Sequence, residues 1–180
     1  MRKLTKKRGL TLIEIIIAMS IVVIIGGVIT TIAVSSSKIL TKVDMRSELQ
    51  MEAQIIQNQL TSLALESEGV VAVEFEGESD VIQSMIIQNE SLFHQYVFSD
   101  MILTYQLYEI IESDEEDEYN LIQTRELSSK VSKVQVVPST EQELLNSEYM
   151  QFNISLTKSR GAETVDYELD NYIVFRNFKK

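Results

Sequence analysis

The chain has no cysteine, one histidine and one proline in 180 residues. Without cysteine it can form no disulfide, no thiolate nucleophile and no cysteine-ligated zinc site. A single histidine, His94, excludes any site that needs two. Basic residues are also scarce, since 16 Lys and Arg against 27 Asp and Glu give a net charge of −11. This sign disfavours general binding to phosphate backbones, and we expect no direct nucleic-acid binding.

Patterns that carry catalysis are also missing. The sequence contains no nucleophile-elbow, Walker or Rossmann pattern, so we expect neither enzymatic activity nor a cofactor or metal. The segment 112–118 has six acids in seven residues. Its carboxylates could serve as calcium ligands, but it lacks the glycine and the ligand spacing of an EF-hand loop. The favoured interpretation is a solvated hairpin tip. His94 has no second candidate metal ligand nearby in the sequence, so the favoured interpretation of this residue is a surface or packing role.

The charges are unevenly placed along the chain. Five bases and no acid occupy the first nine residues, and from Ile15 to Val34 the chain then runs 20 residues without a charge. As a helix that stretch measures about 30 Å, the thickness of the hydrocarbon core of a bilayer. The pattern predicts a membrane span with its basic end in the cytoplasm and the acidic body outside.

Two general interpretations of this N-terminus stay open. A cleavable signal peptide would have Ala33-Val34-Ser35 as its small-x-small cleavage site, although its apolar region would be longer than the usual ~7–15 residues and would contain Glu14. An uncleaved single-pass anchor would place Glu14 near the cytoplasmic edge of the membrane, where a long side chain reaches water at small cost.

A third interpretation accounts for the glutamate. Residues 7–17, KRGLTLIEIII, resemble the leader and N-terminus of type IV prepilins and type II secretion pseudopilins. The resemblance implies that a prepilin peptidase cuts between Gly9 and Leu10 and methylates the new amine of Leu10, where the family usually has phenylalanine. It also implies that Glu14 pairs with the terminal amine of Leu10 in a neighbouring subunit. Because a carboxylate at mid-membrane costs about 2.5–3.5 kcal/mol, such pairing would offset the charge and fix the axial register between subunits.

The helix is predicted to continue beyond the apolar run. Apolar residues recur at strides of 4 and 3 from Leu49 to Leu63, which is one face of an amphipathic helix. With no proline before Pro138, we predict one helix over about residues 11–66. Gly26 and Gly27 are its weak point because each costs about 1 kcal/mol. They indicate either local melting during extraction from the membrane or close helix packing.

The rest of the chain changes to the period of strands. We predict a short strand or extended link at 70–75 and a short helix or irregular segment over 81–98. Strands are predicted at 101–111, 119–127, 130–137, 149–158 and 165–175, with a turn at 160–162. These make an antiparallel sheet of about four or five strands. The predicted fold class is α+β: a type IV pilin-like fold in which a long N-terminal helix, half membrane-spanning and half amphipathic, packs on an antiparallel β-sheet head.

The order of these strands also resembles PilW-type minor pilins and the related J-type and competence pseudopilins. We therefore expect a leader peptide at 1–9, a transmembrane or filament-core helix at 10–34, its amphipathic continuation at 35–66, and a globular head at 67–180. The resemblance implies a minor structural subunit of a pilus or pseudopilus with a role in assembly priming or at the tip. Its partners would be prepilin peptidase, other major and minor pilins, the inner-membrane assembly platform and, before assembly, the lipid bilayer.

A different class of function also fits these features. The chain could be a single-pass membrane-anchored protein whose head binds an extracellular ligand and never polymerises. Replacing Glu14 would block incorporation in the first case and have no effect in the second. The leader and helix are shared by type IV pili, type II secretion and competence systems, so these three remain alternatives.

Overall fold

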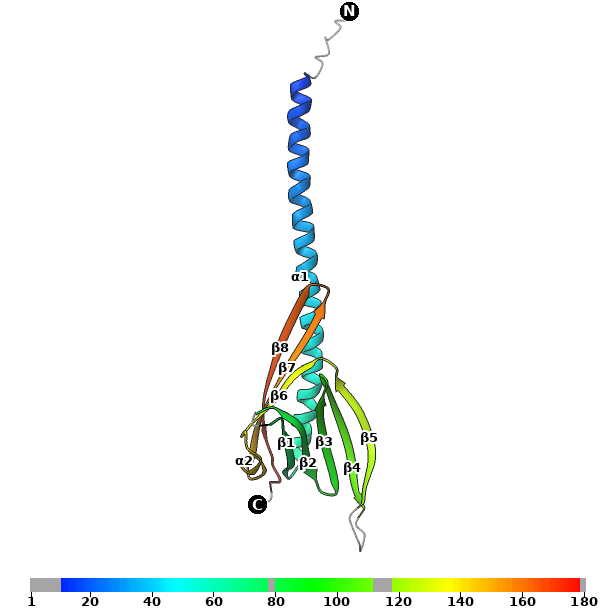
Figure 1. Ribbon diagram of the computed structural model, residues 1–180, viewed down its shortest axis with the longest axis vertical. Coiled ribbons are helices and arrows are strands. Elements are labelled where there is room, and N and C mark those ends of the chain that lie inside the picture. The colour runs from blue at the N-terminus through cyan, green and yellow to red at the C-terminus, as the bar shows by residue number, and fades with distance from the viewer. Residues whose placement is uncertain (1–10, 78–79, 112–117, 179–180) are drawn as a thin grey trace, which may run out of the picture. The chain divides into compact units, whose positions relative to one another are not determined.

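The structure is a computed structural model that describes residues 11–77, 80–111 and 118–178. The chain divides into two compact units, residues 1–41 and residues 42–180. Helix α1 (Leu12–Glu66) contributes residues to both of them (Figure 1). Its bounds confirm the prediction of one uninterrupted helix.

The first unit, taken by itself, is helical and has no buried core. Every residue from 11 to 40 is exposed, including large aliphatic side chains such as Leu12, Val23 and Ile29. A helix that is apolar all round needs lipid or other protein around it, since water disfavours so much apolar surface. Within the described residues, α1 is the one helix long and apolar enough to cross a membrane.

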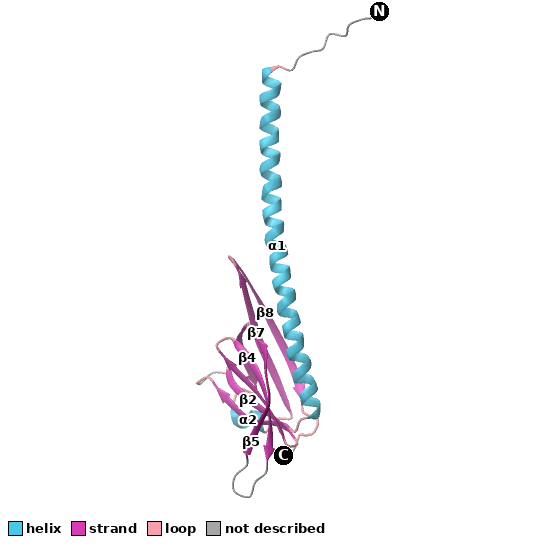
Figure 2. Ribbon diagram, turned by 90° about the vertical axis from the view of Figure 1, so that its right-hand side faces the viewer, coloured by secondary structure: helices cyan, strands magenta, loops and turns pink. Residues whose placement is uncertain are grey.

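The second unit contains two antiparallel sheets. The strands of the larger sheet follow one another in chain order: β1 (Gly69–Phe75), β2 (Ile82–Asn89), β3 (Leu92–Ser99), β4 (Ile102–Ile111) and β5 (Glu118–Ser128). The smaller sheet has the order β6 (Val131–Val137), β7 (Tyr149–Arg160) and β8 (Glu163–Val174), with α2 (Glu141–Leu145) between β6 and β7. Figures 1 and 2 show the two sheets beside the C-terminal part of α1.

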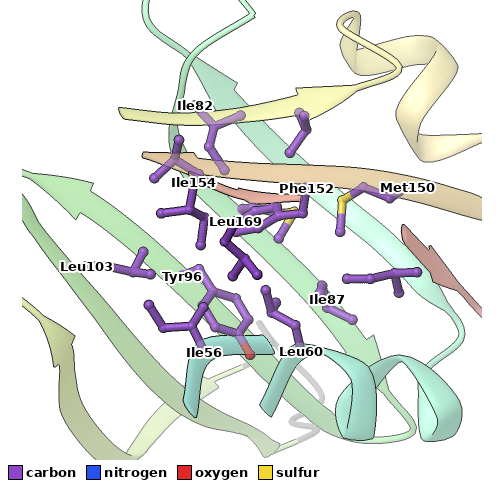
Figure 3. Packing of buried hydrophobic residues seen from close by; sticks show 14 of the residues in the cluster. Ile56, Leu60, Ile82, Ile87, Tyr96, Leu103, Met150, Phe152, Ile154 and Leu169 are labelled. Carbon is purple, nitrogen blue, oxygen red and sulfur yellow. The ribbon is translucent and has the colours of Figure 1, made fainter. Parts of the chain in front are cut away.

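The core of this unit is one face of α1 packed on the inner faces of both sheets. All five predicted apolar positions between Leu49 and Leu63 are buried, and Met45 and Ala64 extend the same stripe. Figure 3 shows Ile56 and Leu60 pointing toward Tyr96 of the larger sheet and Leu169 of the smaller one. The helix stripe therefore joins the two sheets into a single core.

Ion pairs border this apolar interface. Lys130 Nζ lies 3.1 Å from Glu48 Oε1 and also bonds Glu52, while Lys158 bonds the other oxygen of Glu48. Ser128 donates a hydrogen bond of 2.7 Å to Glu52. Hydrogen bonds from Lys158 and Lys130 lower the pKa of Glu48. These contacts fix the rotation of α1 about its axis relative to the chain segments that lead into β6 and run along β7.

The prediction of a short helix or irregular segment over 81–98 is wrong, because this region forms the hairpin of β2 and β3. The turn between β2 and β3 and the turn that follows β3 carry no glycine. Glu90 has a φ of 52°, and Asp100 and Met101 have φ values of 52° and 66°. Two-residue hairpin turns need such positive φ angles and usually signal them with Asn-Gly or Asp-Gly. Without that signal the two strands could not be recognised.

The predicted number of strands is also wrong. The described residues form eight strands in two sheets, because β2 and β3 add to the expected set and the strands divide between two layers. Helix α2 was not predicted, since its five residues are too few to show a helical period. Its buried Leu144 joins the same core.

The other strand predictions are confirmed. Strand β4 pairs with β5, and β7 alternates with Met150, Phe152, Ile154 and Leu156 buried. The turn at 160–162 is present, with Gly161 at a φ of 64°, where glycine carries no steric penalty. The acidic segment 112–117 lies outside the described residues.

Adjacent isoleucines on α1 test the packing of the stripe. Ile56 is fully buried, whereas Ile55 is 44% exposed. We expect Ile56→Ala to lower the free energy of unfolding of the head by about 2–5 kcal/mol, because it leaves a cavity between α1 and the two sheets. The matched variant Ile55→Ala should cost less than about 1 kcal/mol. Denaturant unfolding of the full chain in detergent measures both, and equal losses would contradict the packing described.

Burial of the lone histidine predicts that the stability of the head depends on pH. His94 is 9% exposed, and its Nδ1 lies 2.8 Å from the Tyr105 hydroxyl. Within the described residues its Nε2 has no hydrogen-bond partner. Burial lowers the pKa of His94, and this effect outweighs the attraction of Glu66, which raises it.

Because the unfolded chain binds this proton at a higher pH than the folded chain, we expect the free energy of unfolding to fall as the pH drops below about 6.5. The loss should stop once the lower pKa of the folded state is passed. Denaturant unfolding of the full chain in detergent between about pH 7.5 and 5.5 measures the slope. His94→Gln removes the only imidazole, so a variant with the same slope as the wild type would refute this origin.

Candidate functional site

The predicted site residues lie at the start of α1 and along its apolar half. Gly9 and Leu10, the expected processing residues, lie outside the described residues. Glu14 lies in the first turn of α1, and Gly26 and Gly27 lie within the helix. The structure thus describes the helix that follows the expected cleavage position.

Glu14 forms a capping box with Thr11. The backbone N–H and the hydroxyl of Thr11 each donate a hydrogen bond of 2.8 Å to Glu14 Oε2. In return, the backbone N–H of Glu14 donates to Thr11 Oγ1 at 3.4 Å. This reciprocal arrangement satisfies backbone groups that the first turn of a helix otherwise leaves unpaired. A negative charge there also interacts favourably with the helix dipole.

Thr11 is a site residue that the sequence analysis did not identify. The signal was present, because Thr-x-x-Glu before an apolar run is a pattern for a helix start. Its consequence concerns Glu14, whose Oε2 accepts two hydrogen bonds within its own chain. The carboxylate is therefore held near the helix terminus before any other subunit approaches.

Hydroxyl groups in the apolar half of α1 are satisfied by the helix itself. Thr30 and Thr31 donate hydrogen bonds of 2.9 and 3.0 Å to the carbonyls of Gly26 and Gly27. Ser20 donates in the same way to the carbonyl of Ile16 at 2.8 Å. These bonds let polar side chains enter an apolar environment with their donors occupied.

The two glycines leave a small notch in the helix surface. A Cβ atom added at either position would meet nothing within 4 Å, so none of the residues that the structure describes packs on them. Small residues at such positions allow another helix to approach closely in a membrane. Both proposed roles of Gly26 and Gly27, local melting and close packing, remain predictions.

Side chains of the head do not form a metal centre in the part of the chain that the structure describes. No group of three or more His, Asp or Glu residues there could hold a metal ion. The acidic segment 112–118, for which the sequence favours a solvated hairpin tip over calcium binding, lies outside the described residues except for Glu118, where β5 begins. His94 has a packing role, since it lies in the inner layer of the larger sheet beside Tyr105.

The role of Thr11 can be tested through the first turn of α1. We expect Thr11→Val to fray this turn, because loss of an N-cap typically costs about 0.5–2 kcal/mol. The measurement is the helical ¹³Cα chemical shift of residues 12–16 for the full chain in detergent micelles. Thr30→Val is the matched control, since it also removes a hydroxyl from α1 but leaves the cap intact. Unchanged shifts in Thr11→Val would show that the capping box does not form.

Comparison with known proteins identifies this same segment. Residues 4–33 match a family model described as the prokaryotic N-terminal methylation motif. The match includes Gly9, Leu10, Thr11 and Glu14 and ends within the apolar half of α1. No curated protein and no solved structure gives a significant match to the chain. The motif and the apolar helix together indicate a type IV pilin-like substrate of prepilin peptidase, anchored in a membrane by a single span.

Proposed function

We propose that this chain is a minor pilin-like structural subunit of a pilus or pseudopilus. Prepilin peptidase cuts the precursor after Gly9 and methylates Leu10, and the processed chain joins a filament made with other pilins. The observation that carries this proposal is the match of residues 4–33 to the methylation motif at the start of a helix that exposes apolar side chains on all sides.

The proposal assigns a structural role to each part of the chain. The precursor resides in the cytoplasmic membrane with its basic N-terminus in the cytoplasm, because basic residues before a span favour this orientation. The assembly platform then transfers the apolar half of α1 from lipid to the filament core. The head contributes a surface, in a priming or tip position of the PilW type, and no catalysis. The acidic charge of the chain disfavours direct binding of nucleic acid.

Pairing of Glu14 with the amine of Leu10 in a neighbouring subunit gives assembly its register. In water-free surroundings an unpaired carboxylate is costly, and a positive amine at one axial height offsets that cost. Without such a charge pair, apolar helices can pack against one another at many axial positions of similar energy. One charge pair near the N-terminus selects among them.

A second candidate function is favoured by the capping box. Because Thr11 already donates two hydrogen bonds to Glu14, the glutamate has a role in a helix that never polymerises. The chain would then be a single-pass anchor for an extracellular binding head.

Two substitutions separate the cap from the charge. Glu14→Gln keeps an oxygen that Thr11 can bond and so preserves the capping box, but removes the negative charge. Thr11→Val removes the cap and preserves the charge. In cells with active prepilin peptidase, we expect both variants to lose residues 1–9. We expect only Thr11→Val to be recovered from sheared surface filaments, with Glu14→Gln reduced at least about tenfold.

Intact mass and N-terminal sequencing provide the readout for processing, and quantification in the sheared fraction provides the readout for assembly. A wild-type chain that begins at methylated Leu10 supports the proposal. A wild-type chain that retains Met1 beside an active peptidase would overturn it. Processed wild-type chain that never enters filaments would favour the anchor function instead.

A further inference from the structure

A groove lies on the outer face of the larger sheet, away from α1. Its volume is about 420 Å³, within the usual range of ~300–1,000 Å³ for small-ligand sites. All the side chains that line it are uncharged, in a chain of net charge −11. They are Val71, Ala72, Ile86, Phe93, Gln95, Tyr108 and Tyr119.

Strand register brings these side chains to one face. Phe93 pairs with Tyr108, and Gln95 pairs with Ile86 on one side and Gln106 on the other. Directly paired residues in an antiparallel sheet share a face, and their neighbours His94 and Tyr96 point into the core. The alternation that builds the core therefore also builds an outer row of aromatic and amide groups.

Contacts among these side chains set their orientation. The rings of Phe93 and Tyr119 meet edge to face, with centroids 5.8 Å apart and an interplanar angle of 71°. The Tyr108 hydroxyl donates a hydrogen bond of 3.0 Å to Gln106 Oε1. Tyr119 is nevertheless 62% exposed. A large aromatic surface held in place and left open to water is suited to a ligand.

The groove borders a second one of different chemistry. Gln95 also lines a groove of about 450 Å³ that includes Glu74, Glu76 and Asp100. Carboxylates accept hydrogen bonds from hydroxyl groups, and they repel anions. The amide of Gln95, which both donates and accepts, lies between the aromatic and the acidic surfaces.

We propose that this outer face binds a neutral saccharide, with Tyr119, Tyr108 and Phe93 packing against the apolar C–H face of a sugar ring. Gln95 bonds the ring's hydroxyls, because a hydroxyl donates and accepts as an amide does. Carboxylates beside the groove accept further hydroxyls and exclude acidic sugars. The ligand class follows from the combination of aromatic, amide and carboxylate groups without a basic side chain in the lining of either groove.

A proline-rich peptide is the main competitor, since aromatic grooves also bind such segments. The amide of Gln95, which lines both grooves, favours a ligand whose groups both donate and accept, because proline has no N–H to offer the amide oxygen. The proposal concerns the head surface alone. It does not depend on cleavage after Gly9 or on incorporation into a filament.

The test uses the full chain in phosphatidylcholine nanodiscs, because maltoside detergents would themselves present sugars. Saturation-transfer NMR titrations with cellohexaose, chitohexaose and xylohexaose measure binding, with hexagalacturonic acid as the anionic probe. We expect at least one neutral probe to bind and the anionic probe not to bind. Tyr119→Leu should raise the dissociation constant about tenfold, and Gln95→Leu should also weaken binding.

The matched control is Tyr172→Leu. Tyr172 is likewise 62% exposed, but it lies on β8 of the smaller sheet and stacks on Tyr149. Its substitution should leave the dissociation constant unchanged. The proposal is overturned if none of the neutral probes binds, if Tyr119→Leu binds as the wild type does, or if hexagalacturonic acid binds equally well. Binding of a proline decapeptide at Tyr119 in place of the sugars would reassign the groove to peptides.

Discussion

Burial of one stripe of α1 is the interaction on which the head depends. The stripe runs from Met45 to Ala64, and the inner faces of both sheets pack on it, with Tyr96 on one side and Leu169 on the other (Figure 3). In the part of the chain that the structure describes, the sheets are linked by the bridge between Val81 and Gln135 and by a few hydrogen bonds, such as the one from the Val131 N–H to the Met101 carbonyl. Each sheet therefore relies on the helix to cover its apolar face, because a single sheet cannot bury its own inner side.

The N-terminal half of α1, unlike the half that packs on the sheets, is exposed. No residue from 11 to 40 is buried, whereas Met45 is fully buried. The change within a few residues divides α1 chemically into a part that needs lipid or neighbouring helices and a part that needs its own sheets. Lys42 stands at this change and pairs with Glu163 of the β7–β8 hairpin at 2.8 Å. A partly exposed pair of this kind contributes little stability, so at this end of the stripe the attachment of the head depends on apolar burial more than on the Lys42–Glu163 pair.

Hydrophobic periodicity predicted the helix and strands that have one buried and one exposed face. The stride of 3 and 4 along α1 and the alternation along β7 were both visible, because each element has one face in the core and one outside. The hairpin of β2 and β3 was not recognised, since the turn within it and the turn after it place Glu90 and Met101 at positive φ, where sequence patterns lead one to expect glycine. At the site, the leader motif predicted Glu14 but not its bonds to Thr11, because the motif identifies a charged residue, whereas the bonds depend on the side-chain conformations in the first turn of the helix.

Thr11 would provide hydrogen bonds to Glu14, whereas the terminal amine of a neighbouring subunit would compensate its charge. Two hydrogen bonds from Thr11 occupy Oε2 and hold the carboxylate against the first turn, yet both donors are neutral and the negative charge stays. In a medium of low dielectric, a hydrogen-bonded carboxylate without a counter-charge still carries a large desolvation cost. The cap therefore does not replace the proposed ion pair with Leu10 of another subunit. Because the capping box already holds the Glu14 side chain in place, less conformational entropy is lost when the ion pair forms. The capping box and the ion pair therefore reinforce each other.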